Sequence, residues 1–533
     1  MTFRAQPRSL LFMALVAFLA TAILPLIAIL AYFVIGLILS PSAITHVLLD
    51  SRQFVLLNRS VTVAVSATAV ALLLGLPTAI VLTSKDLPYR RLFYFLVLIP
   101  LLIPPYIMAG AWIHLLSPNG LLNRLLTVIF GPGALLSVSS LPGCAWCLGI
   151  SFFPLIAIVV GTGLSQIDSN LVDIARLSTG QWGIFRYAIV PQIWPHIIAS
   201  ICLVIIFVIG QYSVPSLLGV NTYPVEIFSQ FSAFYNDTAA VATALPLIVL
   251  VIFLILLQKW VMLSHNYIRI TPSSETRSPI KLGGFKYYAV VFLTALFLVT
   301  FLCPFSSVLA HTQSPGKIWR TLYSSTESIM TTSILALLAT IFATVIAFPI
   351  GQYLAYRRTR FARILDILCW LPIAIPGTVI GLGLVKLSNL LPSMQKLDSV
   401  GILLVCAYVG MFGAFSVRIF EAAYRRVDPN IEEAAAIDCQ RWYQRLLYVD
   451  IPIHSGAIAA SMVIVFVLAI GELNATVLLI PPGKATLSVT IDNLLHYGAN
   501  VQASILCLVE ALLVLSVVSG GLLVWCIVGK RQK

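Results

Sequence analysis

The most conspicuous shortage in this sequence is charge. Only 10% of its 533 residues are charged, and 60% are hydrophobic. Ordinary soluble domains carry roughly 25% charged residues, and a soluble chain of this composition would expose too much apolar surface to water. The composition therefore excludes a soluble globular protein. Because one membrane-spanning helix takes roughly 20 apolar residues, the length fits about a dozen spans.

Chemical motifs are also scarce. No Gly-rich phosphate loop ending in Lys-Ser or Lys-Thr occurs, which argues against ATP hydrolysis by this chain. Histidine is rare, and no cluster of His, Asp, Glu and Tyr has metal-ligand spacing, so we expect no metal and no cofactor. Cys144 and Cys147 have the spacing of a redox or metal pair but lack a second pair. We expect the cysteines to be packing residues, and a disulfide between these two stays open.

Twelve apolar segments are long enough to span a bilayer, which predicts an all-α integral membrane protein. They lie at about 10–38, 60–83, 92–116, 143–165, 197–218, 241–263, 286–310, 329–354, 364–388, 400–420, 456–480 and 503–528.

The positive charges orient these segments. With the N-terminus inside, most of the 32 lysines and arginines fall in inside segments. Since Lys and Arg favour cytoplasmic loops, both termini are predicted to be cytoplasmic. The net charge of +13 then faces anionic lipid and cytoplasmic partners, not nucleic acid. The eight that fall outside are Arg52, Arg59, Arg124, Lys317, Arg320, Lys386, Lys396 and Lys484.

The sequence contains an internal repeat. A polar stretch at 264–285 predicts a cytoplasmic linker between residues 1–263 and 286–533, each with six segments. Because six is even, both halves have the same orientation, a parallel repeat. Two unrelated bundles of similar composition are the alternative, but proline, tryptophan and glycine recur in one order. The matched pairs are Pro77 and Pro349, Pro100 and Pro372, Pro104 and Pro376, Trp182 and Trp442, and Gly210 and Gly471.

Two matched loops, about 168–191 and 428–452, each follow the fourth span of their half. Each has an acidic residue, apolar residues at helical spacing, a tryptophan and a closing proline, which predicts a short amphipathic helix beneath the membrane. Such a helix either rests on lipid headgroups or docks in a groove of another protein. Its double occurrence favours docking. The candidate residues are Asp173, Ala175, Arg176, Gly180, Trp182 and Pro191, and then Glu433, Ala434, Ala435, Trp442 and Pro452.

These loops resemble the Glu-Ala-Ala loops of ABC importer permeases, the inner-membrane components of binding-protein-dependent transport systems. Three further stretches resemble the fused, two-domain ferric iron type: SPNGLLNR at 117–124, YSVPSLLG at 212–219 and ELNATVLLIPPG at 472–483. The resemblance implies a transport subunit of a bacterial inner membrane that is not itself an enzyme. It also implies two copies of a cytoplasmic ABC ATPase, which use the ATP, and an extracytoplasmic substrate-binding protein.

The loops depart from the family pattern in two respects. Thr179 and Cys439 stand where the family has a glycine, and Gly180 comes one residue late. Ile174 also replaces the first alanine of the first loop. The first loop is therefore the one whose ATPase contact is expected to differ.

Polar residues and prolines within the spans mark a candidate translocation path. Gln211 and its repeat partner Glu472 are predicted to line it, with Pro104 and Pro376 as helix-bending residues. The alternative is that Gln211 and Glu472 only bond neighbouring helices. Lys386 and Asp366, near the ends of their span, are expected to reach toward water.

The leading hypothesis is thus the permease subunit of an ATP-driven importer, with ferric iron as cargo. Thiamine, polyamine or phosphonate uptake within the same family is the alternative. A secondary transporter driven by an ion gradient is an alternative from another class, and it would require charged residues deep in several spans.

Overall fold

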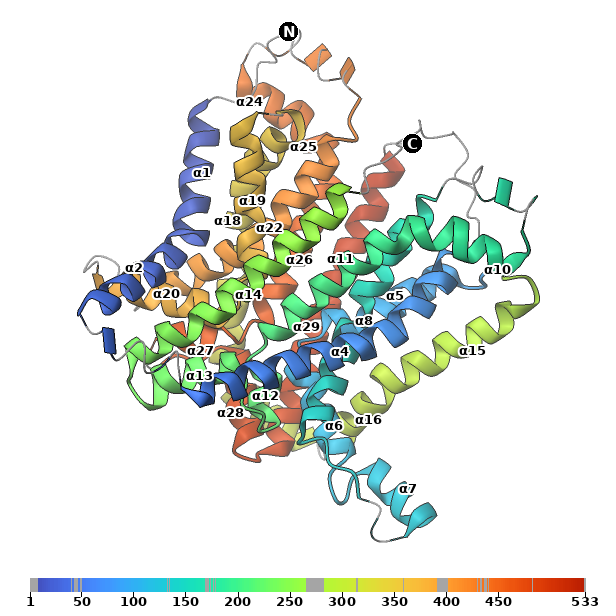
Figure 1. The fold of residues 1–533 in the computed structure, drawn as a ribbon, viewed down its shortest axis with the longest axis vertical. Helices are drawn as coiled ribbons and strands as arrows, with labels where there is room; N and C mark the ends of the chain where they lie inside the picture. The colour runs from blue at the N-terminus through green and yellow to red at the C-terminus, as the bar shows by residue number, and fades with distance from the viewer. Residues whose placement is uncertain are drawn as a thin grey trace.

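The computed structural model describes most of the chain, and the described residues are mostly helical (Figure 1). The described residues are 8–39, 41–42, 47, 50–131, 133, 135–167, 172, 174–175, 177, 179–264, 282–312, 315–357, 359–390, 401–428, 430–431, 434–435, 439, 441–481 and 483–531. Most of the predicted linker, 264–285, lies outside them.

Eight spans are continuous helical stretches. They are α4 (Ser51–Thr83), α8 (Leu141–Ser165), Ile184–Ile209 with α11 (Val190–Ile209), α14 (Asp237–Ser264), Gly283–Ala310 with α15 (Lys286–Phe297) and α16 (Cys303–Ala310), α18 (Thr326–Tyr356), α22 (Ile402–Tyr424) and α29 (Asn500–Arg531).

Four further spans are bent pairs of helices. The pair α1 (Arg8–Ala22) and α2 (Leu24–Leu39) bends by 45°, and α5 (Arg90–Leu102) and α6 (Pro105–Leu115) bend by 91°. The pair α19 (Arg360–Ala374) and α20 (Gly377–Leu390) bends by 103°, and Trp442–Ile453 with α26 (Ser455–Ile470) bends by 74°. If each pair counts as one span, the described residues hold up to 12 spans. Each overlaps one of the twelve predicted segments, which confirms the prediction of an all-α membrane protein.

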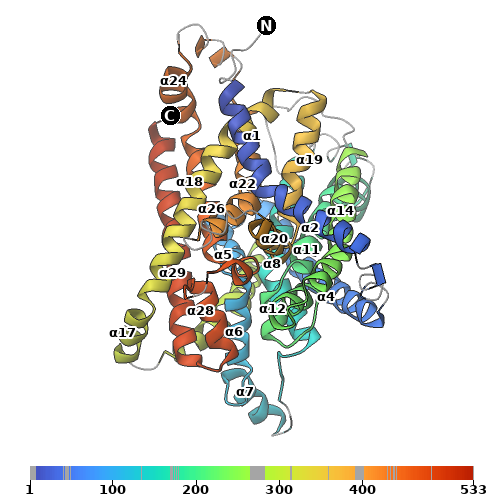
Figure 2. The same cartoon turned by 90° about the vertical axis from the view of Figure 1, so that its left-hand side faces the viewer.

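Shorter helices connect the spans on two opposite sides. On the side where α1 begins and α29 ends, called here the terminal side, lie α10 (Gln181–Gly183) and α24 (Trp442–Arg445) (Figure 1). On the opposite, far side lie α7 (Leu121–Phe130), α12 (Ser213–Leu217), α17 (Pro315–Ser324) and α28 (Leu487–His496) (Figure 2). Also connecting spans on the far side are α13 (Tyr223–Phe228) and α27 (Thr476–Leu479). The sequence analysis predicted none of these far-side helices.

The repeat is visible in how the two halves pack. In the first half α4 packs along α8, and in the second α18 packs along α22. Each long helix turns a stripe of small residues to its neighbour, because small side chains let two membrane helices approach closely. The two stripes match position for position, 272 residues apart: Ala64, Ala67, Ala71, Gly75 and Ala79, and then Ala336, Ala339, Ala343, Ala347 and Gly351.

The first span of each half packs against the other half. In the second half α20 and α22 contact α1 and α2, and the backbone of Pro25 lies so close to Gly383 that a Cβ there would collide with it. Reciprocally, α16 packs on α6, where the Ser307 hydroxyl donates to the Ala111 carbonyl at 3.0 Å. The halves are therefore consecutive in sequence but interlocked in space.

The expectation that Lys386 reaches water is wrong. Its side chain is only 2% exposed and pairs with Asp237 of α14 in the first half, while the rings of Tyr32 and Phe231 lie within 5.6 Å of Nζ. Asp366 is also paired: its carboxylate bridges Lys259 at 3.0 Å and Arg418 at 2.5 Å. Both residues thus form ion pairs that join the two halves.

The Lys386–Asp237 pair makes an asymmetric stability prediction. Asp237→Asn leaves the Lys386 ammonium buried without its counter-ion, a change that typically costs about 3–5 kcal/mol. Lys386→Met removes the buried charge, and the Asp237 side chain, which is 55% exposed, stays hydrated. We expect Asp237→Asn to lower the thermal midpoint in detergent much more than Lys386→Met. Equal midpoints for the two variants would contradict the buried position of Lys386.

Candidate functional site

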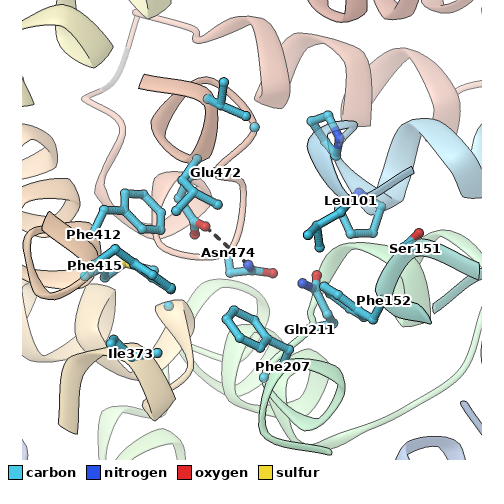
Figure 3. Close-up of a pocket in the computed structure, with 18 of the residues that line it drawn as sticks. Leu101, Ser151, Phe152, Phe207, Gln211, Ile373, Phe412, Phe415, Glu472 and Asn474 are labelled. Carbon is cyan, nitrogen blue, oxygen red and sulfur yellow. Dashed lines mark hydrogen bonds between the residues drawn. The ribbon is translucent and has the colours of Figure 1, made fainter. Parts of the chain in front are cut away.

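A cavity of about 470 Å³ lies between the two halves, and most of its lining is apolar (Figure 3). The first half contributes segments of α5, α8 and α11, and the second contributes segments of α19, α22 and α26. All four predicted path residues, Gln211, Glu472, Pro104 and Pro376, line this one chamber. The structure thus brings them together, while their role in translocation stays a prediction.

Proline sets the breaks that shape the far end of the chamber. In the first half α5 ends at Leu102, Ile103 is extended, and Pro104 precedes α6. The second half repeats this arrangement at Ile375 and Pro376. A proline lacks the N–H that a helix needs and forces the preceding residue into extended geometry, so a helix ends there. By contrast, the matched prolines Pro100 and Pro372 lie inside α5 and α19.

The two halves cross each other at these breaks in a reciprocal way. Gly471, which follows α26, lies against Pro104, and its repeat partner Gly210, which follows α11, lies against Pro376. A Cβ built on Gly471 would be 2.5 Å from Pro104 Cγ, whereas one built on Gly210 would be 3.5 Å from Pro376 Cα and Cβ. These two Gly–Pro crossings bound the chamber at its far end. The lining continues from them toward the terminal side, to residues such as Leu98, Ile158 and Val463.

Glu472 is buried and held by the broken backbone after α26. Its carboxylate accepts the Ala475 N–H at 2.8 Å and lies 3.5 Å from the Asn474 side-chain amide. Asn474 in turn accepts the N–H of Tyr212, a first-half residue, at 2.9 Å. Figure 3 shows the Glu472 and Asn474 side chains facing the chamber. Glu472 thus bonds its own segment after α26 and also lies in the chamber wall.

Gln211 lies across the chamber from Glu472, and Ser213 donates to its side-chain oxygen at 3.3 Å (Figure 3). Aromatic rings fill the wall between them. Phe207 stacks on Phe415 of the other half with a centroid distance of 6.5 Å and lies 5.7 Å from Phe152. The sequence analysis missed these rings and Asn474. Apolar composition hides such phenylalanines among many others, but Asn474, two residues after Glu472, could have been found.

The candidate docking residues lie on the terminal side, away from the chamber. Asp173, Arg176 and Glu433 lie outside the described residues. Large apolar side chains are exposed in both loops: Ile174, Leu177 and Trp182 in the first, and Trp442, Leu447 and Tyr448 in the second.

The remaining candidate docking residues occupy corresponding positions in the two loops. Each loop ends in a short α-helix and a π-helical turn, Ile184–Ile189 and Leu446–Asp450, before Pro191 in the next span and Pro452 in α25 (Ile451–Ile453). Ala175 is half-buried, Gly180 and Ala434 are exposed, and Ala435 is buried. Their docking role stays a prediction.

The cysteine pair left open by the sequence is not bonded here. Cys144 and Cys147 lie in the first turns of α8, and both are buried free thiols. They pack in the core of the first half.

Comparison with known proteins decides the family. Residues 71–262 and 343–527 match the family described as the binding-protein-dependent transport system inner membrane component. The chain belongs to this family. Both matched regions begin inside the small-residue stripes of α4 and α18 and run through the candidate docking loop of their half. Each region also contains one glycine and one proline of the two Gly–Pro crossings. The match thus confirms two family repeats in one chain.

Individual relatives in this family carry different cargo names. The Fe(3+)-transport system permease protein FbpB 2 of Haemophilus influenzae is 23% identical over 457 residues, which cover 84% of this chain and 85% of that protein. A protein named for 2-aminoethylphosphonate transport, PhnV of Salmonella typhimurium, is 29% identical over 34% of this chain and 66% of its own length. The spermidine/putrescine permease PotB of H. influenzae is 28% identical over 29% of this chain and 54% of its own.

The unequal Gly–Pro crossings predict unequal effects of adding a methyl group. Gly471→Ala forces Pro104 away, and overpacking of this kind typically costs about 1–3 kcal/mol. Gly210→Ala has room, because its new Cβ meets Pro376 at an ordinary contact distance. We expect Gly471→Ala to lower the thermal midpoint in detergent, and Gly210→Ala to leave it nearly unchanged. A larger loss in Gly210→Ala would contradict the geometry of the crossings.

Proposed function

We propose that this chain is the complete membrane-spanning part of an ATP-driven ABC importer, in which one fused protein takes the place of a permease dimer. The observation that carries the proposal is the chamber between two family repeats, bounded at its far end by reciprocal Gly–Pro crossings. Such an arrangement suits alternating access, because small movements of one repeat against the other would open the crossings.

The terminal side would face the cytoplasm. This proposal is supported by the sequence, in which most lysines and arginines fall in the segments predicted to be inside, as the positive-inside rule requires. Two copies of a separate ATPase would dock there on the two loops, whose exposed apolar side chains suit a protein groove. An extracytoplasmic binding protein would deliver cargo to the far side. The chain would then bind no cofactor of its own, since ATP is used by the partner.

Ferric iron is the proposed cargo. The supporting observation is that the relative named for Fe(3+) transport matches over 84% of this chain, whereas the phosphonate and polyamine relatives match over about a third. Glu472 is the one carboxylate among the described lining residues of the chamber. Because Fe³⁺ held by a protein needs several oxygen or nitrogen ligands, cargo selection would reside in the binding protein.

The docking role of the second loop can be tested at Ala434, which is exposed beside the buried Ala435. Ala434→Arg should weaken ATPase association by about tenfold, which corresponds to roughly 1.4 kcal/mol, by placing a long charged side chain in the interface. Ala434→Ser, a small side chain at the same position, is the matched control. The measurement is retention of the ATPase on the immobilised full-length chain. Unchanged retention in Ala434→Arg, with an unchanged elution profile, would count against docking at this loop.

The energy source and cargo can be tested in proteoliposomes that contain the chain, its ATPase and its binding protein. We expect uptake of radiolabelled ferric iron to require ATP on the ATPase side and to survive collapse of proton and sodium gradients. Competition with spermidine or 2-aminoethylphosphonate should have no effect. Uptake by the chain alone on an ion gradient would instead identify a secondary transporter. ATP-dependent uptake of an amine or phosphonate, but not of iron, would overturn the cargo alone.

A further inference from the structure

The helix α6, which follows Pro104, makes its polar contacts with the opposite half. The Tyr106 hydroxyl lies 2.5 and 2.7 Å from the two carboxylate oxygens of Glu510 in α29. Further along α6, the Ala111 carbonyl accepts from Ser307, and His114 lies 3.4 Å from Ser504 of α29. A helix of the first half is therefore fastened along its length to the second.

The Tyr106–Glu510 contact is the deepest of these. Both side chains are almost completely buried, and Glu510 lies ten residues, or about 15 Å, from the far-side end of α29. A carboxyl group at that depth in a bilayer is costly and is typically retained for a function. The sequence analysis did not single out Glu510, although a lone acidic residue in an apolar span is a recognisable signal. Tyr106 is two residues from Pro104, so this contact fixes the edge of α6 that forms the crossing.

The second half lacks the equivalent contact. Thr378 stands 272 residues after Tyr106, and its buried hydroxyl has no hydrogen-bond partner among the described residues. The ion pair that fastens α20 to the first half is made by Lys386, ten residues after Pro376. Ten helical residues span about 15 Å, so this attachment is far from the crossing. The helix α20 is thus held at its outer end and left without a polar contact at Thr378.

The packing distances also make the crossing at Pro104 the tighter of the two. Gly471 packs so tightly on Pro104 that a Cβ has no room, whereas Gly210 leaves an ordinary van der Waals space against Pro376. This packing difference is independent of the hydrogen bonds. Two separate observations therefore describe one tight, fastened crossing and one looser crossing.

We infer that Tyr106 and Glu510 are positioning residues that hold Pro104 against Gly471, so that the far end of the chamber opens at the Pro376–Gly210 crossing. The inference rests on the proposed transport function. In this arrangement α6 stays with the second half, while α20 pivots about the Lys386–Asp237 pair and carries Pro376 away from Gly210. Although α6 and α20 are repeat partners, only α20 would then move at the crossing.

The first test measures cargo transported per ATP hydrolysed in the reconstituted complex with ferric iron. Tyr106→Phe removes the donor and Glu510→Leu the acceptor, and each should lower this ratio by about tenfold, the factor expected for one lost bond to a carboxyl group. ATP hydrolysis should continue. Glu510→Gln keeps an acceptor for Tyr106 and should stay within about twofold of wild type, the spread expected for a retained bond. Thr378→Val, the repeat-matched control, should behave as wild type.

The second test locates the opening. In a background without native cysteines, Ser213→Cys reports on the Pro376–Gly210 side and Leu473→Cys on the Pro104–Gly471 side. With the complex trapped by ATP and vanadate, a membrane-impermeant thiol reagent added from the far side should label Ser213→Cys faster than Leu473→Cys.

The outcomes separate the inference from the proposed function. Transport per ATP equal to wild type in the Glu510→Leu variant, or equal labelling of the two cysteines, would overturn the inference alone. A loss in Glu510→Gln as large as in Glu510→Leu would also overturn it, in favour of a proton-carrying role. A wild-type complex without ATP-dependent transport would overturn the proposed function, and the inference with it.

Discussion

The chamber depends on one constraint: backbone that leaves helical geometry inside a membrane must find its hydrogen bonds within the protein. The segment after α26 meets it with side chains. Glu472 accepts the N–H of Ala475, Asn474 accepts the N–H of Tyr212, and the Glu472 carbonyl accepts the hydroxyls of Thr476 and Ser488. A carboxylate that is costly in an apolar environment is stabilised because it replaces missing helical bonds. The same bonds tie the second half to the first at Tyr212, so the break that opens the chamber wall also joins the two repeats.

Much of the architecture followed from local sequence signals. Apolar length predicted twelve spans, and the prolines and glycines at matched offsets predicted a duplication that the family match confirms. Gln211, Glu472, Pro104 and Pro376 were found together because helix breaks and polar groups are rare within spans. The exchange of first spans was not predictable in this way, since any apolar helix can pack on either half. The prediction that Lys386 reaches water was wrong for a related reason. Its partner, Asp237, is distant in sequence, and the rule that lysines near span ends reach water considers only the depth of the lysine in the membrane.

The two repeats share the small-residue packing that builds each half and differ in the polar contacts that join the halves. The small-residue stripes of α4 and α18 match at every position because close packing along α8 and α22 tolerates little change. Between the halves, Tyr106 corresponds to Thr378 and His114 to Lys386, and each makes a different contact. Two repeats fused in one chain can diverge in this way. The two crossings then consist of different residues, so mutation can change one crossing while the other stays the same. A symmetric dimer of identical chains could not separate them.

This divergence bears on how force from the terminal side would reach the far side. The second half has interlocked side chains along that route: Phe348, Tyr424 and His454 form an aromatic cluster beside α25. Their repeat positions in the first half, Leu76, Leu164 and Ile193, are aliphatic. Each aromatic pair stabilises its contact by about 0.5–1.5 kcal/mol beyond the effect of buried area, so this cluster holds its helices together more firmly than aliphatic packing would. A push on the second loop would therefore pass to α18 and α22 with little loss, and α22 packs directly on α20, which carries Pro376 at its start. The more firmly packed connection, from the second loop through α22 to α20, thus ends at the looser Pro376–Gly210 crossing. With this combination, movement of the second loop would contribute more than movement of the first to opening the far end of the chamber.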